Sequence, residues 1–547
     1  MMETASFPII WEHGVLPFLV EFIPKWCGPG HVISVSRGNG PNKRRICIMT
    51  RTQLSRARRL TIAVHVRDLL PDSYKSATTF AFSTGQVNRL VWARGLGKSL
   101  PDEICFPRNP FLYGKPCMGD SIGIRGNGTF QDSTSTLGPC ITVGGGSYWL
   151  ANFHPFADAF ASLESVSVEH PSPCDRSRCL EEAHDAMDDI DDFKLGSLTA
   201  TSGLDLKTTR ITHDPYWEEC DKDSPLVVTD WSIIMAKSNQ ANVMRRFPSE
   251  AQPLLQLAPV KSTAHVSPGS IVCSSGRTSG HQRGLVCEIP AHVSGDAWGN
   301  GTGRATREWF IEEPDAFDGG EDGWIRGGIG VEGDSGAAII EMETNTLVGQ
   351  LWGRNCYWGP GPRHTFFTPI CDIFDDIQER CGQQGRPQLP RYRDEADRYP
   401  VYPACRHCYD LQAYQSSRRS SRESLRSMVM GGGGLSHSEQ DLTSLEAQSE
   451  LATPKDSQQY WLRHAGMDDS MISGIVSPCA AASTSFHQPG TPGIVGDMRS
   501  PYATTLHSED LYDAEYAPPG DTGKRVALPL VKSSATDVTS NKKQRME

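Results

Sequence analysis

The amino-acid sequence predicts a mainly β protein of two or three domains. The chain has 547 residues, whereas one domain usually holds about 100 to 200. Glycine and proline number 52 and 37, which is typical of short strands joined by turns. Short apolar runs such as residues 136–143 and 225–234 indicate strands over much of residues 111–382. We expect a small α/β unit before this region and a disordered tail after it.

Composition excludes several classes of protein. The formal net charge is −12, so the chain as a whole is not a polyanion-binding protein. No apolar run is long enough to span a bilayer, and a membrane is not an expected partner. Glu3, Glu12 and Glu21 interrupt residues 1–26, which also lack the basic start and the cleavage site of a secretory signal. We therefore expect a cytoplasmic protein, with a nuclear location as the alternative, whose 16 cysteines are mostly reduced thiols.

Residues 1–110 form the first expected unit, and the sequence assigns it no role. Residues 44–49 and 60–66 have the apolar character of buried or half-buried strands, and His65 in the second is interpreted as structural. A basic cluster surrounds them: Arg37, Lys43, Arg44, Arg45, Arg51, Arg56, Arg58 and Arg59. No aromatic side chains alternate with it to stack bases, so we interpret it as a solvated face and do not expect nucleic acid as a partner.

A first β region follows, over residues 111–238. Strands are expected at residues 120–124 and 136–143, and a glycine turn at 144–146 leads into a strand that returns to His154. By itself, a histidine at this position can be a loop residue that caps the end of the strand. Residues 164–194 form an acidic insertion without the spacing of a calcium loop, so we expect a solvated segment and no metal.

An aspartate interrupts the apolar run at residues 225–234. Asp230 stands between two apolar strand halves, where burial is costly unless the carboxylate has a partner. Its carboxylate therefore needs a hydrogen-bond partner, and the plain alternative is an aspartate at a β-bulge or strand start. Asp205 and Asp214 are rivals, but neither precedes so apolar a strand.

A second β region covers residues 239–382. Residues 269–280 and 285–289 form an expected hairpin, and residues 329–340 form a glycine-punctuated loop that presents Ser335 before an apolar strand. Such a loop exposes a nucleophile and leaves the amides of Gly333 and Ser335 free to bind an oxyanion, although a plain β-turn has the same pattern. Strands at 347–353 and 365–367 precede a helix whose apolar residues fall at i, i+3, i+4 and i+7 from Ile370. Thr368 and Pro369 are expected to form its cap and first turn.

Residues 333–336, Gly-Asp-Ser-Gly, resemble the signature of chymotrypsin/trypsin-like serine peptidases, which have the double β-barrel of the PA clan. His154, Asp230 and Ser335 also follow that family's order. The resemblance covers about residues 115–382 and implies two six-stranded antiparallel barrels, at 111–238 and 239–382, with a C-terminal helix. Phe153 departs from the usual small residue before the histidine, and the cysteines of exported members are absent. The chain thus looks like an intracellular, fungal-type member.

The resemblance implies a role for each site residue. His154 would act as general base, Asp230 would orient it, and Ser335 would attack a peptide carbonyl. The amides of Gly333 and Ser335 would form the oxyanion hole. The substrate-binding residues implied by the resemblance are Ile329 at the base of the first specificity pocket and Leu351, Trp352 and Gly353 at a substrate-pairing edge. Asp334 should be buried with a basic or amide partner, and no cofactor is expected.

Residues 383–547 are expected to be a mostly disordered tail. Residues 416–427 are rich in serine and arginine, and 431–434 are all glycine. Cys405 and Cys408 have zinc-knuckle spacing, but no second cysteine pair follows, so we interpret the spacing as coincidence. The tail is a candidate for binding a regulatory partner.

These observations favour a serine endopeptidase that acts on a protein or peptide substrate. The alternative is a catalytically inactive fold of the same kind, kept as an intracellular peptide-binding or scaffold module. Retention of all three triad residues favours chemistry, because a binding module needs none of them. A nucleic-acid-binding protein that uses the basic cluster is the third and least favoured hypothesis.

Overall fold

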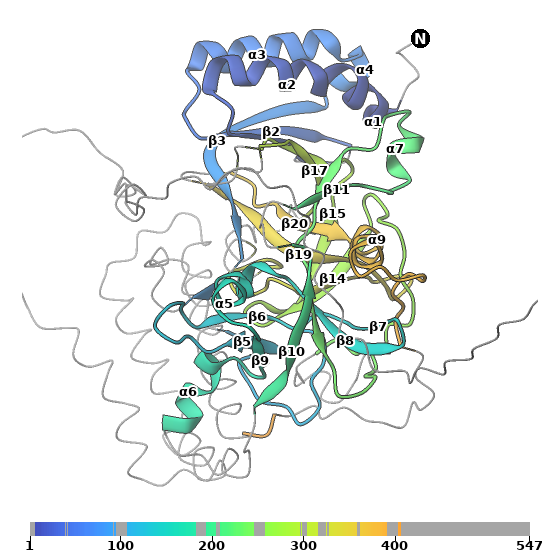
Figure 1. Ribbon diagram of the computed structural model, residues 1–547. Helices are drawn as coiled ribbons and strands as arrows, with labels where there is room; N and C mark the ends of the chain where they lie inside the picture. The colour runs from blue at the N-terminus through green and yellow to red at the C-terminus, as the bar shows by residue number, and fades with distance from the viewer. Residues whose placement is uncertain are drawn as a thin grey trace, which may run out of the picture. The chain divides into compact units, whose positions relative to one another are not determined.

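A computed structural model describes residues 6–38, 40, 42–90, 92–93, 107–181, 193–203, 208–245, 258–295, 297, 303–314, 324, 328–357, 361–390 and 403–405. The chain divides into two compact units, one comprising Met1–Arg178, Ile190–Val401 and Gly520–Glu547 and the other Cys179–Asp189 and Tyr402–Pro519. Strands predominate over helices in the described ranges (Figure 1). The expected tail lies outside them, apart from residues 383–390 and 403–405.

Ten strands form the larger sheet, in the order β15-β14-β18-β19-β20-β17-β16-β1-β2-β3, and β15 also pairs with β17 and β19 with β3. Its strands from the second β region are β14 (Ile271–Gly276), β15 (Gly280–Val286), β16 (Ala291–Val293), β17 (Thr306–Glu312), β18 (Ala338–Glu341), β19 (Thr346–Tyr357) and β20 (Thr365–Pro369). The other three are β1 (His31–Arg37), β2 (Arg44–Thr50) and β3 (Thr78–Arg89). The N-terminal strands thus continue the sheet that carries the serine loop.

The smaller sheet has eight strands, in the order β4-β6-β5-β9-β10-β13-β8-β7. They are β4 (Trp92–Ala93), β5 (Ser121–Ile124), β6 (Ser133–Thr136), β7 (Cys140–Val143), β8 (Gly146–Ala151), β9 (Ser167–Glu169), β10 (Lys194–Thr201) and β13 (Ser232–Met235). A separate pair consists of β11 (Thr209–Ile211) and β12 (Leu226–Val228). The expected acidic insertion contributes β9 to the sheet and α6 (Pro173–Glu181), while residues 182–192 lie outside the described residues.

The N-terminal helices pack on the β1–β3 end of the larger sheet. They are α1 (Phe7–Ile10), a π-helical turn (Trp11–Val15), α2 (Leu16–Cys27), α3 (Arg56–Leu69) and α4 (Asp72–Lys75). Leu16, Leu19 and Ile23 recur on one face of α2 and are buried in the same apolar cluster as β1 and β2 residues. Aromatic contacts of His65 with Phe18 and Phe22 join α3 to α2.

The helical segment Phe7–Cys27 corrects one expectation. It is long and apolar enough to cross a membrane by length and composition, with a mean hydropathy of 1.2 over an 18-residue window. Glu12, Glu21 and Lys25 interrupt the apolar run and so conceal the segment, but they leave its mean hydropathy as high as that of a membrane-spanning helix. Of that window, 44 % is buried inside the protein. Glu12 is buried and forms a bidentate ion pair with Arg307 of β17, with N–O distances of 2.7 and 2.6 Å.

The strand expected at residues 60–66 is wrong, because these residues lie inside α3. Ile62 and Val66, four residues apart, are fully buried, whereas Leu60 and Val64 are 64 % and 46 % exposed. The buried positions therefore follow the helical period of 3.6 and not the strand period of 2. Ser55 caps the helix by accepting a hydrogen bond from the Arg58 N–H at 3.4 Å.

The final expected helix is present, shifted by one residue. It is α9 (Ile370–Arg380), and Pro369 is its N-cap rather than its first-turn residue. Ile370, Ile373, Phe374 and Ile377 are buried, as their spacing predicts. The remaining short helical segments are a 3₁₀ turn (His154–Phe156), α5 (Ala157–Ser162) and α7 (Tyr216–Glu219). Cys405 is buried, and Cys408 lies outside the described residues.

Candidate active site

Three predicted residues meet between the two sheets. His154 begins the 3₁₀ turn that follows β8, Asp230 lies between β12 and β13, and Ser335 lies in the turn before β18. The Ser335 Oγ and His154 Nε2 atoms are 2.8 Å apart. On the other side of the ring, His154 Nδ1 forms a short hydrogen bond with Asp230 Oδ2. All three residues are buried, and Ser335 is 0 % exposed.

Backbone amides hold the aspartate in place. Asp230 Oδ1 accepts hydrogen bonds from the N–H groups of Phe153 and His154, each at 3.0 Å. The carboxylate is thus tied to the same turn that carries the imidazole, so its distance from Nδ1 is set by backbone geometry. Phe153, the departure from the family pattern, is buried and packs edge-on against Phe160 with ring centroids 5.6 Å apart.

A third charged residue enters this site from the N-terminal segment. Arg89, the last residue of β3, places its Nη1 atom 2.6 Å from Asp230 Oδ2. Burial would raise the pKa of Asp230, but the charges of His154 and Arg89 outweigh it and hold the pKa well below its ordinary value of 3.8. Asp230 is therefore ionised at neutral pH.

His154 has the electrostatics of a neutral base. Burial lowers the pKa of His154 below its ordinary value of 6.5, Asp230 opposes this, and the Arg89 charge lowers it further. A neutral imidazole whose Nδ1–H donates to Asp230 has a lone pair on Nε2 for the Ser335 hydroxyl. The arrangement can therefore remove a proton from Ser335 as the hydroxyl attacks.

The serine loop depends on two glycines and on Asp334. Gly333 and Gly336 have φ angles of 94° and 93°, in the left-handed region that favours glycine. Asp334 is buried and accepts four backbone hydrogen bonds: from Thr278 and Ser279 at 2.9 and 3.0 Å, and from Gly330 and Val331 at 3.2 and 3.1 Å. Burial raises the pKa of Asp334, and the amides oppose the shift. These amides are the partner that the sequence left unidentified.

Thr136 of the smaller sheet supports the same loop. Its N–H donates to the Ser335 carbonyl at 2.8 Å, and its hydroxyl donates to the Gly333 carbonyl at 2.8 Å. Gly336 must approach this strand closely, because a Cβ there would lie 2.4 Å from the Thr136 carbonyl oxygen. The loop that carries the nucleophile is thus fixed by the sheet that carries the histidine.

One of the two expected oxyanion amides already has a partner. The Gly333 N–H donates to the Leu90 carbonyl at 2.9 Å. Leu90 follows β3, and its own N–H donates to the Trp352 carbonyl at 3.3 Å. A carbonyl of this chain therefore occupies the position expected for the oxygen of a substrate.

The predicted substrate-pairing edge also carries β3. Gly353 lies opposite Arg89 in the antiparallel pairing of β19 with β3, and the Trp352 carbonyl accepts from Leu90. Leu351 does not contact this strand through its carbonyl, which accepts from Gly336 and from the Asn152 side chain, both at 2.9 Å. Trp352 and Gly353 thus lie on an edge that pairs with this chain's own strand.

Ile329, predicted at the base of the first specificity pocket, is 1 % exposed and belongs to an apolar cluster. Its side chain lies beside Gly284, where Ile311 and Trp324 also converge. Among the rival aspartates, Asp214 accepts hydrogen bonds from Tyr216 and Trp309. Asp205 lies outside the described residues.

No protein-family model and no curated protein matches this chain. Solved structures similar to it include a glutamic-acid-specific serine protease (14 % identity, TM-score 0.27, 48 % of this chain and 96 % of the other). They also include Nocardiopsis protease and Thermobifida fusca protease A, each 14 % identical to this chain, with TM-scores of 0.27 and 0.28. Each match covers 50 % of this chain and 98 % of the other. TM-scores this low do not establish the chemistry of this chain, which depends on its own geometry.

Sequence reasoning missed Thr136, Arg89 and Leu90. Thr136 is one hydroxyl residue among several in a short strand, so its local pattern is not distinctive. Arg89 and Leu90 belong to a segment with no assigned role, and their contacts with Asp230 and Gly333 span long sequence separations. The residues at 78–90 could have indicated a strand, but not that the strand reaches the serine.

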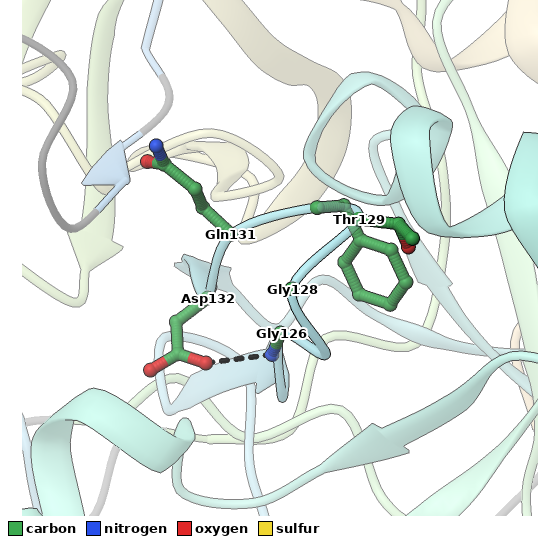
Figure 2. A pocket seen from close by; sticks show the side chains of 6 residues that line it. Gly126, Gly128, Thr129, Gln131 and Asp132 are labelled. Atoms are coloured by element: carbon green, nitrogen blue, oxygen red, sulfur yellow. Dashed lines mark hydrogen bonds between the residues drawn. The ribbon is translucent and has the colours of Figure 1, made fainter.

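A separate pocket lies in the loop between β5 and β6. Figure 2 shows its lining, Gly126, Gly128, Thr129, Phe130, Gln131 and Asp132. The Asp132 carboxylate accepts the Gly126 N–H at 2.6 Å. None of the triad residues lines this pocket. Within the described ranges, no group of three or more His, Cys, Asp or Glu residues is arranged to hold a metal ion.

Proposed function

We propose that this protein is a serine endopeptidase of the chymotrypsin/trypsin-like kind. The observation that carries the proposal is the continuous hydrogen-bonded series from Ser335 through His154 to Asp230. The finer fold proposal is two six-stranded barrels, and the pairing of β15 with β17 as well as β14 supports it for the second region. The first barrel, the domain boundaries and a cytoplasmic location remain part of the proposal.

The mechanism follows from the positions of these groups. Ser335 Oγ attacks a peptide carbonyl as its proton passes to His154 Nε2, and the same proton then goes to the leaving amine. Water repeats the sequence on the acyl-enzyme and releases a carboxylic acid. Asp230 holds the imidazole orientation and stabilises the imidazolium. The amides of Gly333 and Ser335 stabilise the oxyanion, at about 3 kcal/mol for each donor.

The substrate is a peptide or protein segment in an extended conformation. An extended chain pairs with β19 by strand addition at Trp352 and Gly353. The cluster around Ile329 favours an uncharged, apolar side chain at the residue that supplies the carbonyl. A regulatory partner for residues 383–547 belongs to the proposal as well.

The second candidate is a binding module without catalysis. The observation that favours it is the complete burial of Ser335 beneath the chain's own strand. In that case β19 serves to hold β3, and the triad is a remnant of an active ancestor.

Labelling of Ser335 by a fluorophosphonate probe separates the two. Because Leu90 covers the site, the test uses the Leu90→Asp variant, which places a charge at a position that is 1 % exposed and displaces the strand end. Leu90→Gly is a milder second variant that removes the side chain. In either background we expect labelling that is lost with Ser335→Ala and reduced more than about 10⁴-fold with His154→Ala.

Ser274→Ala is the matched control. Ser274 is a buried serine in β14 of the same sheet, outside the triad, so its removal should leave labelling unchanged. If the variants fold, as judged by circular dichroism, and none is labelled, the endopeptidase proposal fails and the binding module is supported.

A further inference from the structure

Strand β3 has two halves with different partners. Residues Thr78 to Thr84 pair in parallel with β2, and residues Gly85 to Arg89 pair antiparallel with β19. Gly85 stands at the change of partner, where a Cβ would lie 2.2 Å from the Cys356 carbonyl oxygen. Figure 1 shows β3, in blue, running from β2 toward the yellow strands around β19. The second half lies along the edge proposed for substrates.

Leu90 then has the hydrogen bonds expected of the residue before a scissile bond. Its N–H donates to Trp352 and its carbonyl accepts from the Gly333 amide at 2.9 Å. Its side chain is 1 % exposed and belongs to the same apolar cluster as Ile329 and Trp352. The Leu90 backbone thus pairs as a bound substrate would, and its side chain is of the apolar kind that the proposed site favours.

The chain is also held after this residue. Strand β4 begins two residues later, and its Trp92 and Ala93 pair antiparallel with Thr134 and Ser133 of β6. β6 is the strand whose Thr136 supports the serine loop. The chain is therefore held by strand pairing on the larger sheet up to Arg89 and on the smaller sheet from Trp92.

Arg89 fastens the strand end to the triad itself. Its ion pair with Asp230 is buried, with the two side chains 15 % and 2 % exposed. Since Ser335 is 0 % exposed, a second peptide cannot reach it while β3 is in place. The first carbonyl presented to Ser335 is therefore one from its own chain.

We propose that this protein cleaves itself in cis at the Leu90–Val91 peptide bond. The inference rests on the proposed endopeptidase function and names its first substrate. Ser335 Oγ bonds to the Leu90 carbonyl carbon, the carbon–nitrogen bond to Val91 breaks, and His154 delivers the serine proton to the new Val91 amine. Water then hydrolyses the Leu90 ester, which leaves a carboxylic acid on Leu90 and restores Ser335.

Intramolecular presentation favours this reaction. The carbonyl is held by the fold and needs no encounter with a second molecule, an advantage that can reach effective concentrations of about 10⁵ M or more. The Arg89 charge acts in the opposite direction, because a cation near His154 disfavours the imidazolium formed during attack. Cleavage is therefore expected to be slower than the turnover of a free substrate by a site cleared of β3.

The experiment follows purified full-length chain by intact mass and N-terminal sequencing. We expect two fragments, residues 1–90 and residues 91–547, in the parent and in the Ser274→Ala control, and neither fragment in Ser335→Ala. The rate should be first order and independent of protein concentration. A tagged Ser335→Ala chain mixed with active protein should stay intact.

The outcomes separate this inference from the proposed function. A parent that stays intact while Leu90→Asp or Leu90→Gly is labelled at Ser335 overturns self-cleavage and leaves the endopeptidase standing, with β3 as an inhibitory cover. A folded protein that is neither cut nor labelled overturns both. Cutting of the tagged chain, or cutting at another bond, also overturns cleavage in cis after Leu90.

Discussion

Glu308 is expected to make the stability of this protein fall as pH rises. It lies in β17, is 0 % exposed, and its Oε1 accepts the Val228 N–H at 3.0 Å just before the segment that carries Asp230. Burial raises the pKa of Glu308 from 4.5 to about 8. The carboxyl group is therefore protonated in the folded protein near pH 7, whereas the same group in the unfolded chain is ionised.

The size of the effect follows from this difference in bound protons. A group whose pKa is raised on folding contributes stability that is fully present below its unfolded pKa and is lost as pH rises through its folded pKa. Between about pH 5 and pH 7 the folded state holds about one more proton at Glu308, so the free energy of unfolding falls by about 1.4 kcal/mol per pH unit. The expected loss over that range is about 3 kcal/mol.

Glu308→Gln removes this dependence and keeps an acceptor oxygen for Val228. The free energies of unfolding of parent and variant are measured in urea at about pH 5, 6 and 7. From pH 5 to pH 7, the parent should lose about 3 kcal/mol of stability relative to the variant. Glu343→Gln, which changes the same charge on an exposed turn, should run parallel to the parent. Parallel curves for Glu308→Gln and the parent would refute the reasoning, because Glu308 would then be ionised in the fold.

Three further predictions concern the site and its support. Because burial lowers the pKa of His154, the self-cleavage rate should rise with pH through a midpoint below 6.5, as measured by fragment yield across a pH series. Glu12→Ala should lower the free energy of unfolding by about 3 to 5 kcal/mol, since it leaves Arg307 buried without its partner. Gly85→Ala should slow self-cleavage and cost about 1 to 3 kcal/mol of stability, because its Cβ would meet the Cys356 carbonyl at 2.2 Å.

Matched variants test the last two. Glu21→Ala removes a carboxylate from the same helical segment, Phe7–Cys27. The Glu21 side chain is 76 % exposed, so its loss should change stability by less than about 1 kcal/mol. Gly14→Ala adds a methyl group with no neighbouring atom within 4 Å apart from the adjoining backbone of its own helix, so it should leave both stability and cleavage nearly unchanged. If Glu12→Ala and Glu21→Ala have equal effects, or Gly85→Ala and Gly14→Ala do, the structural reason given for that pair is contradicted. A self-cleavage midpoint above pH 6.5 would contradict the lowered pKa of His154.

The geometry of the triad could be anticipated because each of its parts has a local signal. Two glycines mark the turn around Ser335, a glycine turn precedes the strand before His154, and apolar strands flank Asp230. Each of these patterns indicates the backbone conformation of a few residues. The order of His154, Asp230 and Ser335 along the chain then suggests that the three act together. The structure brings all three within hydrogen-bond reach.

Other features depend on partners far away in the sequence and had no such signal. The helical character of residues 60–66 was missed because alternating apolar residues also occur on α3, where only Ile62 and Val66 are buried. The burial of Phe7–Cys27 depends on a sheet formed later in the chain. The contacts of Leu90 with Gly333 and Trp352 depend on the register between β3 and β19, which neither strand specifies by itself.

The pairing of β3 with both β2 and β19 determines which carbonyl of the strand reaches Gly333. Because the first half of the strand is registered on β2, the residue that reaches Gly333 is fixed by its number of residues from Thr84. An insertion of one residue between Gly85 and Leu90 would present a different carbonyl and turn alternate side chains to the opposite face. If the proposed activity holds, the residue preferred in an unrelated substrate need not be leucine, provided that its side chain is apolar.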